Sequence, residues 1–468
     1  MDTLNLTLGE LSREIARREV SCRQVVEDHL GRMAEANRAV NAMLYWDGDR
    51  ALAEAGERDQ EAREGRRRGP LHGVPFTVKD CFATPGMPTT CGAKAWAGFT
   101  PSTEAAVVRR LRSAGAILLG KTSLPPFLSS FETENELIGR TRNPYDPERS
   151  SGGSSGGEAA IVATCGSAFG VGSDRGGSIR VPCHFCGVAG LKPTVGTISA
   201  RGHLLLPIGP LKAEPGPIAR STEDLLLIMA VLAGGWPDEG KSPSGLRIAY
   251  YWCCDGTEPD PPIRSALTNA VEVLRDAGHR VEQAEPPGLD RAKALIHSLS
   301  AVHDELFGRE VIPEFFEPRD RTEADLASIA ELWPQRARER AARSAMSGFE
   351  YFSHEMRLDI LRSEMDAFME TYDAIVCPVT GSTALPHGFS KDSSKGEIRT
   401  NTFLYSLSGN PAVCVRAGAD ESGLPVGLQV VGRKLEDREA LRIAGVLEKA
   451  LGGWHAPSLP PVEPAADA

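Results

Sequence analysis

The chain has 468 residues, 41% of them hydrophobic, and a formal net charge of −11, so it can bury a large core. The acidic balance argues against a nucleic-acid surface, and the basic run Arg66–Arg68 is too short to reverse it; a solvated loop is expected there. The N-terminal residues are too charged for a signal peptide, and the longest apolar run, Leu225–Ala233, is too short to span a membrane. We therefore expect a cytoplasmic protein with no nucleic-acid or membrane partner.

The ten cysteines are too few, in a chain of this length, for a disulfide framework. Cys183 and Cys186 have the CxxC spacing of a zinc or redox site, but no second pair of ligands accompanies them. Packed thiols are favoured, and we expect no metal and no cofactor.

The N-terminal part, about residues 5–60, is predicted to be helical. Thr7 with Glu10, and Ser21 with Gln24, have the spacing of capping boxes ahead of periodic apolar residues. A strand over 73–80 follows, in which alternation places Lys79 on the face opposite Val78 and its apolar partners. Such a lysine either extends into water or is buried with a lowered pKa, and the strand pattern alone favours the solvent-exposed orientation.

Residues 103–114 predict a helix and 116–119 a short strand. Gly115–Thr122 matches the phosphate-binding Walker A pattern, but its loop positions form the apolar strand, so we interpret the match as accidental. The remainder shows an α/β alternation without repeats. We expect helices at 158–165, from Ser178 onward, at 263–277 and at 438–451, strands at 168–172, 246–251, 279–283, 374–378, 412–415 and 427–431, and a helical section at 290–372.

Two serines lie in separate glycine clusters, Gly152–Gly157 and Gly176–Ser178. Glycine is kept where the backbone approaches another group closely, and unpaired N–H groups beside a serine can stabilise an oxyanion. Gly152–Gly156 also fits the G-x-S-x-G string of α/β-hydrolases, with His387 as a conceivable downstream partner. However, the residues before it cannot form the required core strand. A flexible Gly/Ser linker is the other alternative, although an apolar helix follows directly.

From about residue 5 to 455 the chain resembles the amidase signature family. The strand ending in Lys79, the cluster Gly152–Gly157, Gly172–Asp174, Gly176–Arg180 and Cys186–Thr194 match that family's motifs in order and spacing. The resemblance implies a fold with a large twisted mixed β-sheet covered on both faces by helices. It implies one domain over 1–468, with N-terminal helices at about 5–60, a signature core at about 71–240, a helical elaboration at about 290–372 and a flexible tail at about 456–468.

The resemblance also implies a Ser–cis-Ser–Lys triad and overrides the outward placement of Lys79. Ser178 is then the nucleophile, Ser154 follows a cis peptide bond and relays the proton, and Lys79 is the base. The chemistry is coherent, because a serine needs a proton acceptor, a lysine accepts only when neutral, and a hydroxyl both donates and accepts. The backbone N–H groups of Arg175, Gly176, Gly177 and Ser178 are expected to form the oxyanion hole, with Ser155 hydrogen-bonding Lys79 and with Asp174 and Arg180 as supports.

We expect an amidase that cleaves a small carboxamide, with an apolar acyl or aryl group preferred and with esterase side activity. The stretch Asn401–Pro411 carries no charge, whereas a glutamine-hydrolysing amidotransferase subunit would need charges for its substrate. That subunit remains the alternative function, and a homodimer is possible. Arg175, where relatives commonly have a smaller residue, faces either an acidic substrate group or a nearby carboxylate. Candidate pocket residues, with core packing as the equal alternative, are Phe127, Leu128, Leu206, Ile208 and Tyr405.

Overall fold

A computed structural model describes residues 2–204, 211–235, 245–252, 256–306 and 346–459. Its centre is an 11-stranded sheet in the order β1-β3-β2-β6-β8-β7-β12-β13-β11-β9-β10. The sheet is mixed: β2 runs parallel to β3 and β6, and β9 runs parallel to β10 and β11, whereas the strands between are antiparallel. The strands are β1 (Met43–Trp46), β2 (Pro75–Lys79), β3 (Ile117–Thr122), β6 (Phe169–Asp174), β7 (Ala189–Lys192), β8 (Glu214–Ala219), β9 (Arg247–Tyr250), β10 (Arg280–Gln283), β11 (Ala374–Pro378), β12 (Ala412–Ala419) and β13 (Pro425–Gly432), with β4 (Glu134–Asn135) and β5 (Gly139–Arg140) forming a separate pair.

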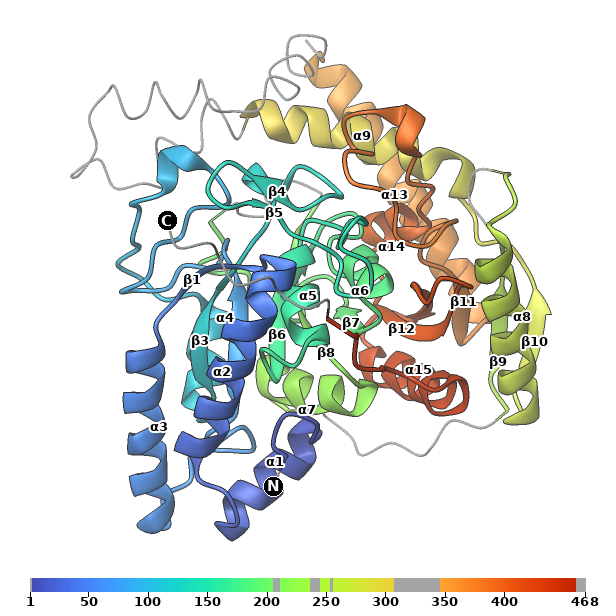
Figure 1. The fold of residues 1–468 in the computed structure, drawn as a ribbon. Coiled ribbons are helices and arrows are strands. Elements are labelled where there is room, and N and C mark those ends of the chain that lie inside the picture. Colours follow the sequence, from blue (N-terminus) through green and yellow to red (C-terminus); the bar gives the residue numbers. More distant parts are fainter. Residues whose placement is uncertain (1, 205–210, 236–244, 253–255, 307–345, 460–468) are drawn as a thin grey trace.

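Helices cover both faces of this sheet (Figure 1), as expected for the fold class. On one face α4, α7, α15 and α8 pack side by side, and on the other α2, α5 and α6 do so. The helices are α1 (Leu8–Arg17), α2 (Cys22–Val40), α3 (Gly48–Arg63), α4 (Ala106–Ser113), α5 (Gly156–Ala163), α6 (Arg180–Cys186), α7 (Thr222–Ala233), α8 (Pro261–Asp276), α9 (Leu289–Leu306), α13 (Gly348–Thr371), α14 (Thr402–Ser408) and α15 (Asp437–Leu451).

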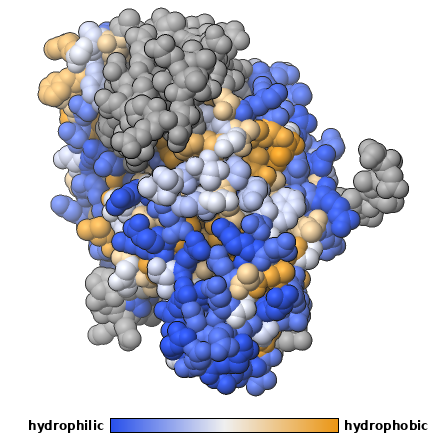
Figure 2. Space-filling model, turned by 90° about the vertical axis from the view of Figure 1, so that its left-hand side faces the viewer, coloured by the Kyte–Doolittle hydropathy of each residue, from blue (hydrophilic) through white to orange (hydrophobic). Residues whose placement is uncertain are grey.

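Of the two capping boxes predicted at the N-terminus, the one at Thr7 is confirmed and the one at Ser21 is present only in half. Thr7 Oγ1 accepts from the Glu10 N–H at 3.2 Å and Glu10 accepts from the Thr7 N–H at 2.9 Å, which completes the predicted capping box of α1. At α2, Ser21 accepts from the Gln24 N–H at 3.0 Å. Residues Arg66–Arg68 are exposed, as expected for a solvated loop. Figure 2 shows the α3 side of the molecule, where hydrophilic residues predominate over the lower half.

The predicted helical elaboration begins and ends in helices, α9 and α13, whose apolar residues join α14 in a second core cluster. The predicted flexible tail at about 456–468 lies mostly outside the described residues. The helix expected to open at Ser178 begins at Arg180 instead, because residues 175–179 form the turn that leaves β6.

Candidate active site

Lys79 ends β2, a strand buried at every position. Its side chain has 0% relative exposure, and its Nζ lies 2.7 Å from Ser154 Oγ, 3.3 Å from Ser173 Oγ and 3.4 Å from the Ser173 carbonyl oxygen. Burial lowers the pKa of Lys79 to about 8, although nearby acidic groups, Asp174 among them, partly oppose this. The outward orientation favoured by the strand pattern alone is therefore wrong, and the amine is close to neutrality at moderately alkaline pH.

The first glycine cluster holds Ser154 against this amine. The Gly153–Ser154 peptide bond is cis, as the family resemblance implied, and α5 begins at Gly156. A Cβ on Gly153 would lie only 2.6 Å from the Ser130 carbonyl oxygen and 2.7 Å from the Glu132 nitrogen. Glycine is needed here because another stretch of backbone occupies the space of a side chain.

Ser178 lies in the turn between β6 and α6 and is only partly buried. Its carbonyl oxygen accepts a hydrogen bond from the Ser155 N–H at 3.1 Å, so the two glycine clusters are in contact. In the described part of the chain, Ser178 Oγ forms no hydrogen bond, so there is no direct bond between it and the predicted relay, Ser154, in this structure. Lys79 and Ser154 are thus brought together, with Ser178 on the adjoining turn.

The residues predicted to form the oxyanion hole lie in the turn between β6 and α6, and their backbone N–H groups differ in their partners. The Gly177 N–H donates to Asp174 Oδ1 at 2.7 Å, so this donor is not free for a substrate, contrary to expectation. Among the described residues, nothing accepts from the N–H groups of Gly176 and Ser178. The Thr402 hydroxyl donates to the Gly176 carbonyl oxygen and so fixes the orientation of the Gly176–Gly177 peptide.

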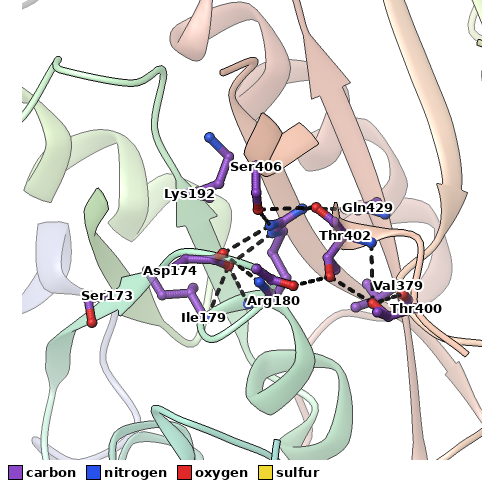
Figure 3. Close-up of polar contacts among 12 residues, drawn as sticks. Ser173, Asp174, Ile179, Arg180, Lys192, Val379, Thr400, Thr402, Ser406 and Gln429 are labelled. Atoms are coloured by element: carbon purple, nitrogen blue, oxygen red, sulfur yellow. Dashed lines mark hydrogen bonds and ion pairs between the residues drawn. The ribbon is translucent and has the colours of Figure 1, made fainter. Parts of the chain in front are cut away.

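Asp174 and Arg180 form a fully buried ion pair that supports this turn (Figure 3), with Arg180 Nη2 2.9 Å from Asp174 Oδ1. Burial would raise the pKa of Asp174, but the charge and hydrogen bonds of Arg180 outweigh it and lower the pKa to about 2. Arg180 also donates to the Thr402 carbonyl oxygen at 3.0 Å, to Ser406 Oγ at 2.9 Å and to Gln429 Oε1 at 3.2 Å. The pair therefore joins the turn to α14 and β13.

The predicted contact between Ser155 and Lys79 is wrong. Ser155 Oγ exchanges 3.4 Å contacts with the backbone N–H and carbonyl of Ser173, and the second hydroxyl beside Lys79 belongs to Ser173. Ser173 lies in the matched motif Gly172–Asp174, directly after the strand expected at 168–172, but it is not among the predicted site residues. Arg175 is only partly buried, and neither of its predicted partners is established.

The candidate pocket residues fall into different environments. Tyr405 is fully buried, with its hydroxyl 2.9 Å from that of Tyr251, and Phe127 packs edge-on against Trp96; both are core residues. Leu128 is partly buried, and Leu206 and Ile208 lie outside the described residues.

The side chains that do lie beside the oxyanion turn were not selected from the sequence. Phe403 Cε1 lies 3.3 Å and Ile296 Cδ1 3.6 Å from the position of a Cβ on Gly176. The Phe131 ring is 6.0 Å from that of Phe403. Ile296 comes from α9 and Phe131 from the chain ahead of Ser154, so no local pattern would have joined them.

The alternative motifs are structural in this fold. Lys121 of the Walker-like stretch lies in β3, fully buried, 3.0 Å from Asp80 Oδ1. Cys183 and Cys186 are buried free thiols in α6, and the described residues contain no group of three potential metal ligands. His387 contacts Glu132 rather than a serine. No helix in the described ranges is long and apolar enough to cross a membrane.

A model of the Amidase family matches residues 24–441. The chain is 34% identical to a glutamyl-tRNA(Gln) amidotransferase subunit of Acidothermus cellulolyticus, over 96% of this chain and 95% of that protein. It is 32% identical to the same subunit of Thermosynechococcus vestitus, over 96% and 98%.

Solved structures agree with this result. A peptide amidase from Stenotrophomonas maltophilia superposes with a TM-score of 0.82 at 26% identity, over 97% of this chain and 99% of that chain. A fatty acid amide hydrolase superposes with a TM-score of 0.80 at 26% identity, over 96% and 86%. The chain therefore belongs to the Amidase family, as an enzyme that acts on carbon–nitrogen bonds.

Proposed function

We propose that this protein hydrolyses a carboxamide through an acyl-enzyme on Ser178. The observation that carries the proposal is the fully buried amine of Lys79, 2.7 Å from Ser154 Oγ and beside the turn that bears Ser178. A buried lysine amine with a lowered pKa is a base, and a hydroxyl next to it can transfer a proton. A surface ion pair, another common role for a lysine, is inconsistent with the complete burial of this amine.

Each of these groups has a part in the proposed reaction. Ser178 Oγ attacks the amide carbon while its proton passes to Ser154 Oγ, whose own proton passes to Lys79. The carbonyl oxygen becomes negative against the N–H groups of Gly176 and Ser178, each such donor contributing about 3–4 kcal/mol in comparable sites. Return of the proton through Ser154 to the nitrogen breaks the C–N bond and releases the amine or ammonia. Water then attacks the ester by the same route and frees Ser178.

The contacts beside the oxyanion turn favour an apolar acyl or aryl amide. Phe403 and Ile296 lie beside Gly176, and Phe131 lies beside Phe403; these three side chains are apolar. Arg399 of the adjoining segment is held by Asp260 Oδ1 at 2.8 Å and by the Gly381 carbonyl oxygen at 3.0 Å.

A second candidate is supported by the comparisons. The relatives at 34% and 32% identity are glutamyl-tRNA(Gln) amidotransferase subunits, which align over nearly their whole length. On this ground we also propose that the chain is a glutamine-hydrolysing subunit that acts with partner proteins. Both candidates use the same acyl-enzyme chemistry and differ in the amide bound.

Two measurements test the proposal. A fluorophosphonate should add one label, mapped to Ser178, and Ser178→Ala should abolish both labelling and hydrolysis, whereas exposed Ser422→Ala should change neither. Ammonia release should then be measured from hexanamide, benzamide and glutamine. Turnover of the apolar amides by the chain alone supports the first candidate, and glutamine turnover restricted to a purified complex supports the second. Label on Ser155, or Ser178→Ala turnover within about tenfold of wild type, contradicts the mechanism.

A further inference from the structure

A long connection between β11 and α14, residues 379–401, runs beside both halves of the candidate active site; we call it the strap. The strap is closed at its base by a bridge between Thr380 and Thr400. Immediately after it, Thr402 holds the Gly176 carbonyl of the oxyanion turn, and Figure 3 shows Val379, Thr400 and Thr402 together next to Arg180. The C-terminal end of the strap is thus fixed to the Ser178 side of the site.

The middle of the strap is attached to the chain that leads to Ser154. The Leu385 carbonyl oxygen accepts from the Ser150 N–H at 2.9 Å, and Pro386 forms a bridge with Arg149. These contacts lie only a few residues ahead of the first glycine cluster. The strap therefore spans from the oxyanion turn to the segment that carries the relay serine.

The most polar attachment is made by Glu132, whose side chain is 2% exposed. Its carboxylate accepts from the Gly388 N–H at 2.7 Å, from Ser390 Oγ at 2.9 Å and from His387 Nδ1 at 3.3 Å. Burial would raise the pKa of Glu132, but these donors outweigh it and lower the pKa to about 2, so the group is a carboxylate at working pH.

The other ring nitrogen of His387, Nε2, lies 3.1 Å from the Pro147 carbonyl oxygen. The ring therefore lies between the Glu132 carboxylate and the Pro147 carbonyl oxygen, and the His387 side chain is only 9% exposed. A nearly buried polar contact of this kind fixes geometry, because a group that loses its partner in the core is left unsatisfied.

The backbone of Glu132 is in direct contact with the glycine that precedes Ser154. Its nitrogen would lie 2.7 Å from a Cβ on Gly153, and the backbone of Ser130 and Phe131 is equally close. There is no free space at this contact, so a displacement of residues 130–132 must displace Gly153 and the hydroxyl next to it.

We propose that Glu132 and His387 are positioning residues that set the distance between Ser154 and Lys79, with the strap as the element they anchor. The inference rests on the proposed function, since it assigns these residues a role in the same proton relay. The contact between Glu132 and His387 fixes residues 130–132, these fix Gly153, and Gly153 fixes the relay hydroxyl.

Four variants test this inference: Glu132→Gln, His387→Gln, their double variant, and Glu134→Gln as matched control. Glu134 also joins this segment to the strap, through Lys391 at 3.1 Å, but that pair is solvent-exposed and lies beyond the Gly153 contact. For each variant, kcat and KM on an amide are measured together with the rate of fluorophosphonate labelling at Ser178. Circular dichroism checks that each variant is folded.

We expect either single variant to reduce kcat and the labelling rate together by about 10- to 100-fold, the effect of a misplacement on the order of 1 Å, with KM within about threefold. The double variant should resemble the singles, because each removes the same interaction. The control should stay within about twofold of wild type.

Three outcomes overturn the inference: wild-type kcat in both singles, losses that multiply in the double variant, or a fall in kcat with an unchanged labelling rate. If Glu132→Gln does not fold, His387→Gln decides alone. Absence of Ser178 labelling in the wild type refutes the proposed function itself, and is thereby distinguished from failure of this inference.

Discussion

Replacing Lys79 by methionine tests the electrostatic condition on which the site depends. In the folded protein, burial lowers the pKa of this amine from 10.5 to about 8. Below pH 8 the fold must therefore hold a buried ammonium, whereas the unfolded chain holds a solvated one. The interval between the two pKa values, at about 1.4 kcal/mol per pH unit, corresponds to about 3 kcal/mol of destabilisation at neutral pH.

The sign of the pH dependence follows from proton binding. Between pH 8 and 10.5 the unfolded chain binds more protons at Lys79 than the folded protein does, so stability rises with pH across this window. Lys79→Met removes this titration. We expect the free energy of unfolding of wild type, relative to the variant, to increase by about 3 kcal/mol across the window. Lys79→Met also loses the hydrogen bond to Ser154, but this loss contributes equally to the difference in the free energy of unfolding at both ends of the pH window.

The assay is reversible urea unfolding of both proteins at several pH values, with amide hydrolysis measured in parallel. Lys79→Met should be inactive throughout. Lys449→Met is the matched control, because this residue is exposed near the end of α15 and its ammonium remains in water in both states. A difference between wild type and Lys79→Met that does not change with pH would refute the burial argument and, with it, the assignment of Lys79 as base.

Three further results are expected. For kcat/KM on an amide, the pH profile should rise about tenfold per unit below pH 8 and level off above it, as Lys79 loses its proton; a profile flat between pH 6 and 9 is inconsistent with this base. Asp174→Asn leaves the buried Arg180 without its carboxylate and should lower the free energy of unfolding, measured in urea, by about 3–5 kcal/mol. Gly177→Ala should reduce kcat with a cost of about 1–3 kcal/mol, because φ is +130° and the new Cβ would lie 2.5 Å from Thr402 Oγ1; unchanged kinetics would show that the turn adapts.

Local signals in the sequence predicted the local structure. The capping box at Thr7 and the end of the helix expected at 263–277 depend on residues within one turn of one another; the box is complete, and α8 ends at Asp276. The helix predicted to start at Ser178 starts two residues later, at Arg180. The reason is that Asp174 accepts a hydrogen bond from the Ile179 N–H at 3.1 Å and keeps residues up to Ile179 in the turn. That acceptor belongs to the preceding strand.

The burial of Lys79 could not be predicted from its strand, because alternation only assigns a face and both faces of β2 turn out to be covered. The family resemblance, and not the strand pattern, implied that Lys79 is buried. Tyr405 shows the converse limit: its place in an uncharged stretch suggested a pocket, yet its hydroxyl is satisfied by Tyr251, 154 residues away, inside the core.

The contacts that hold the site join segments far apart in the sequence. The Thr402 carbonyl that receives Arg180 lies 222 residues from it, and His387 lies 255 residues from Glu132. A chain that ended before β11 would contain Lys79, Ser154 and Ser178 but none of these partners. The buried Arg180 would lose three acceptors and Glu132 all three of its donors, and each unpaired group in a core costs about 1–3 kcal/mol or more. The proposed catalytic side chains are therefore positioned only when the sheet is complete from β2 to β13, which makes the geometry of the proposed relay a property of the whole fold and not of the motif that reveals it.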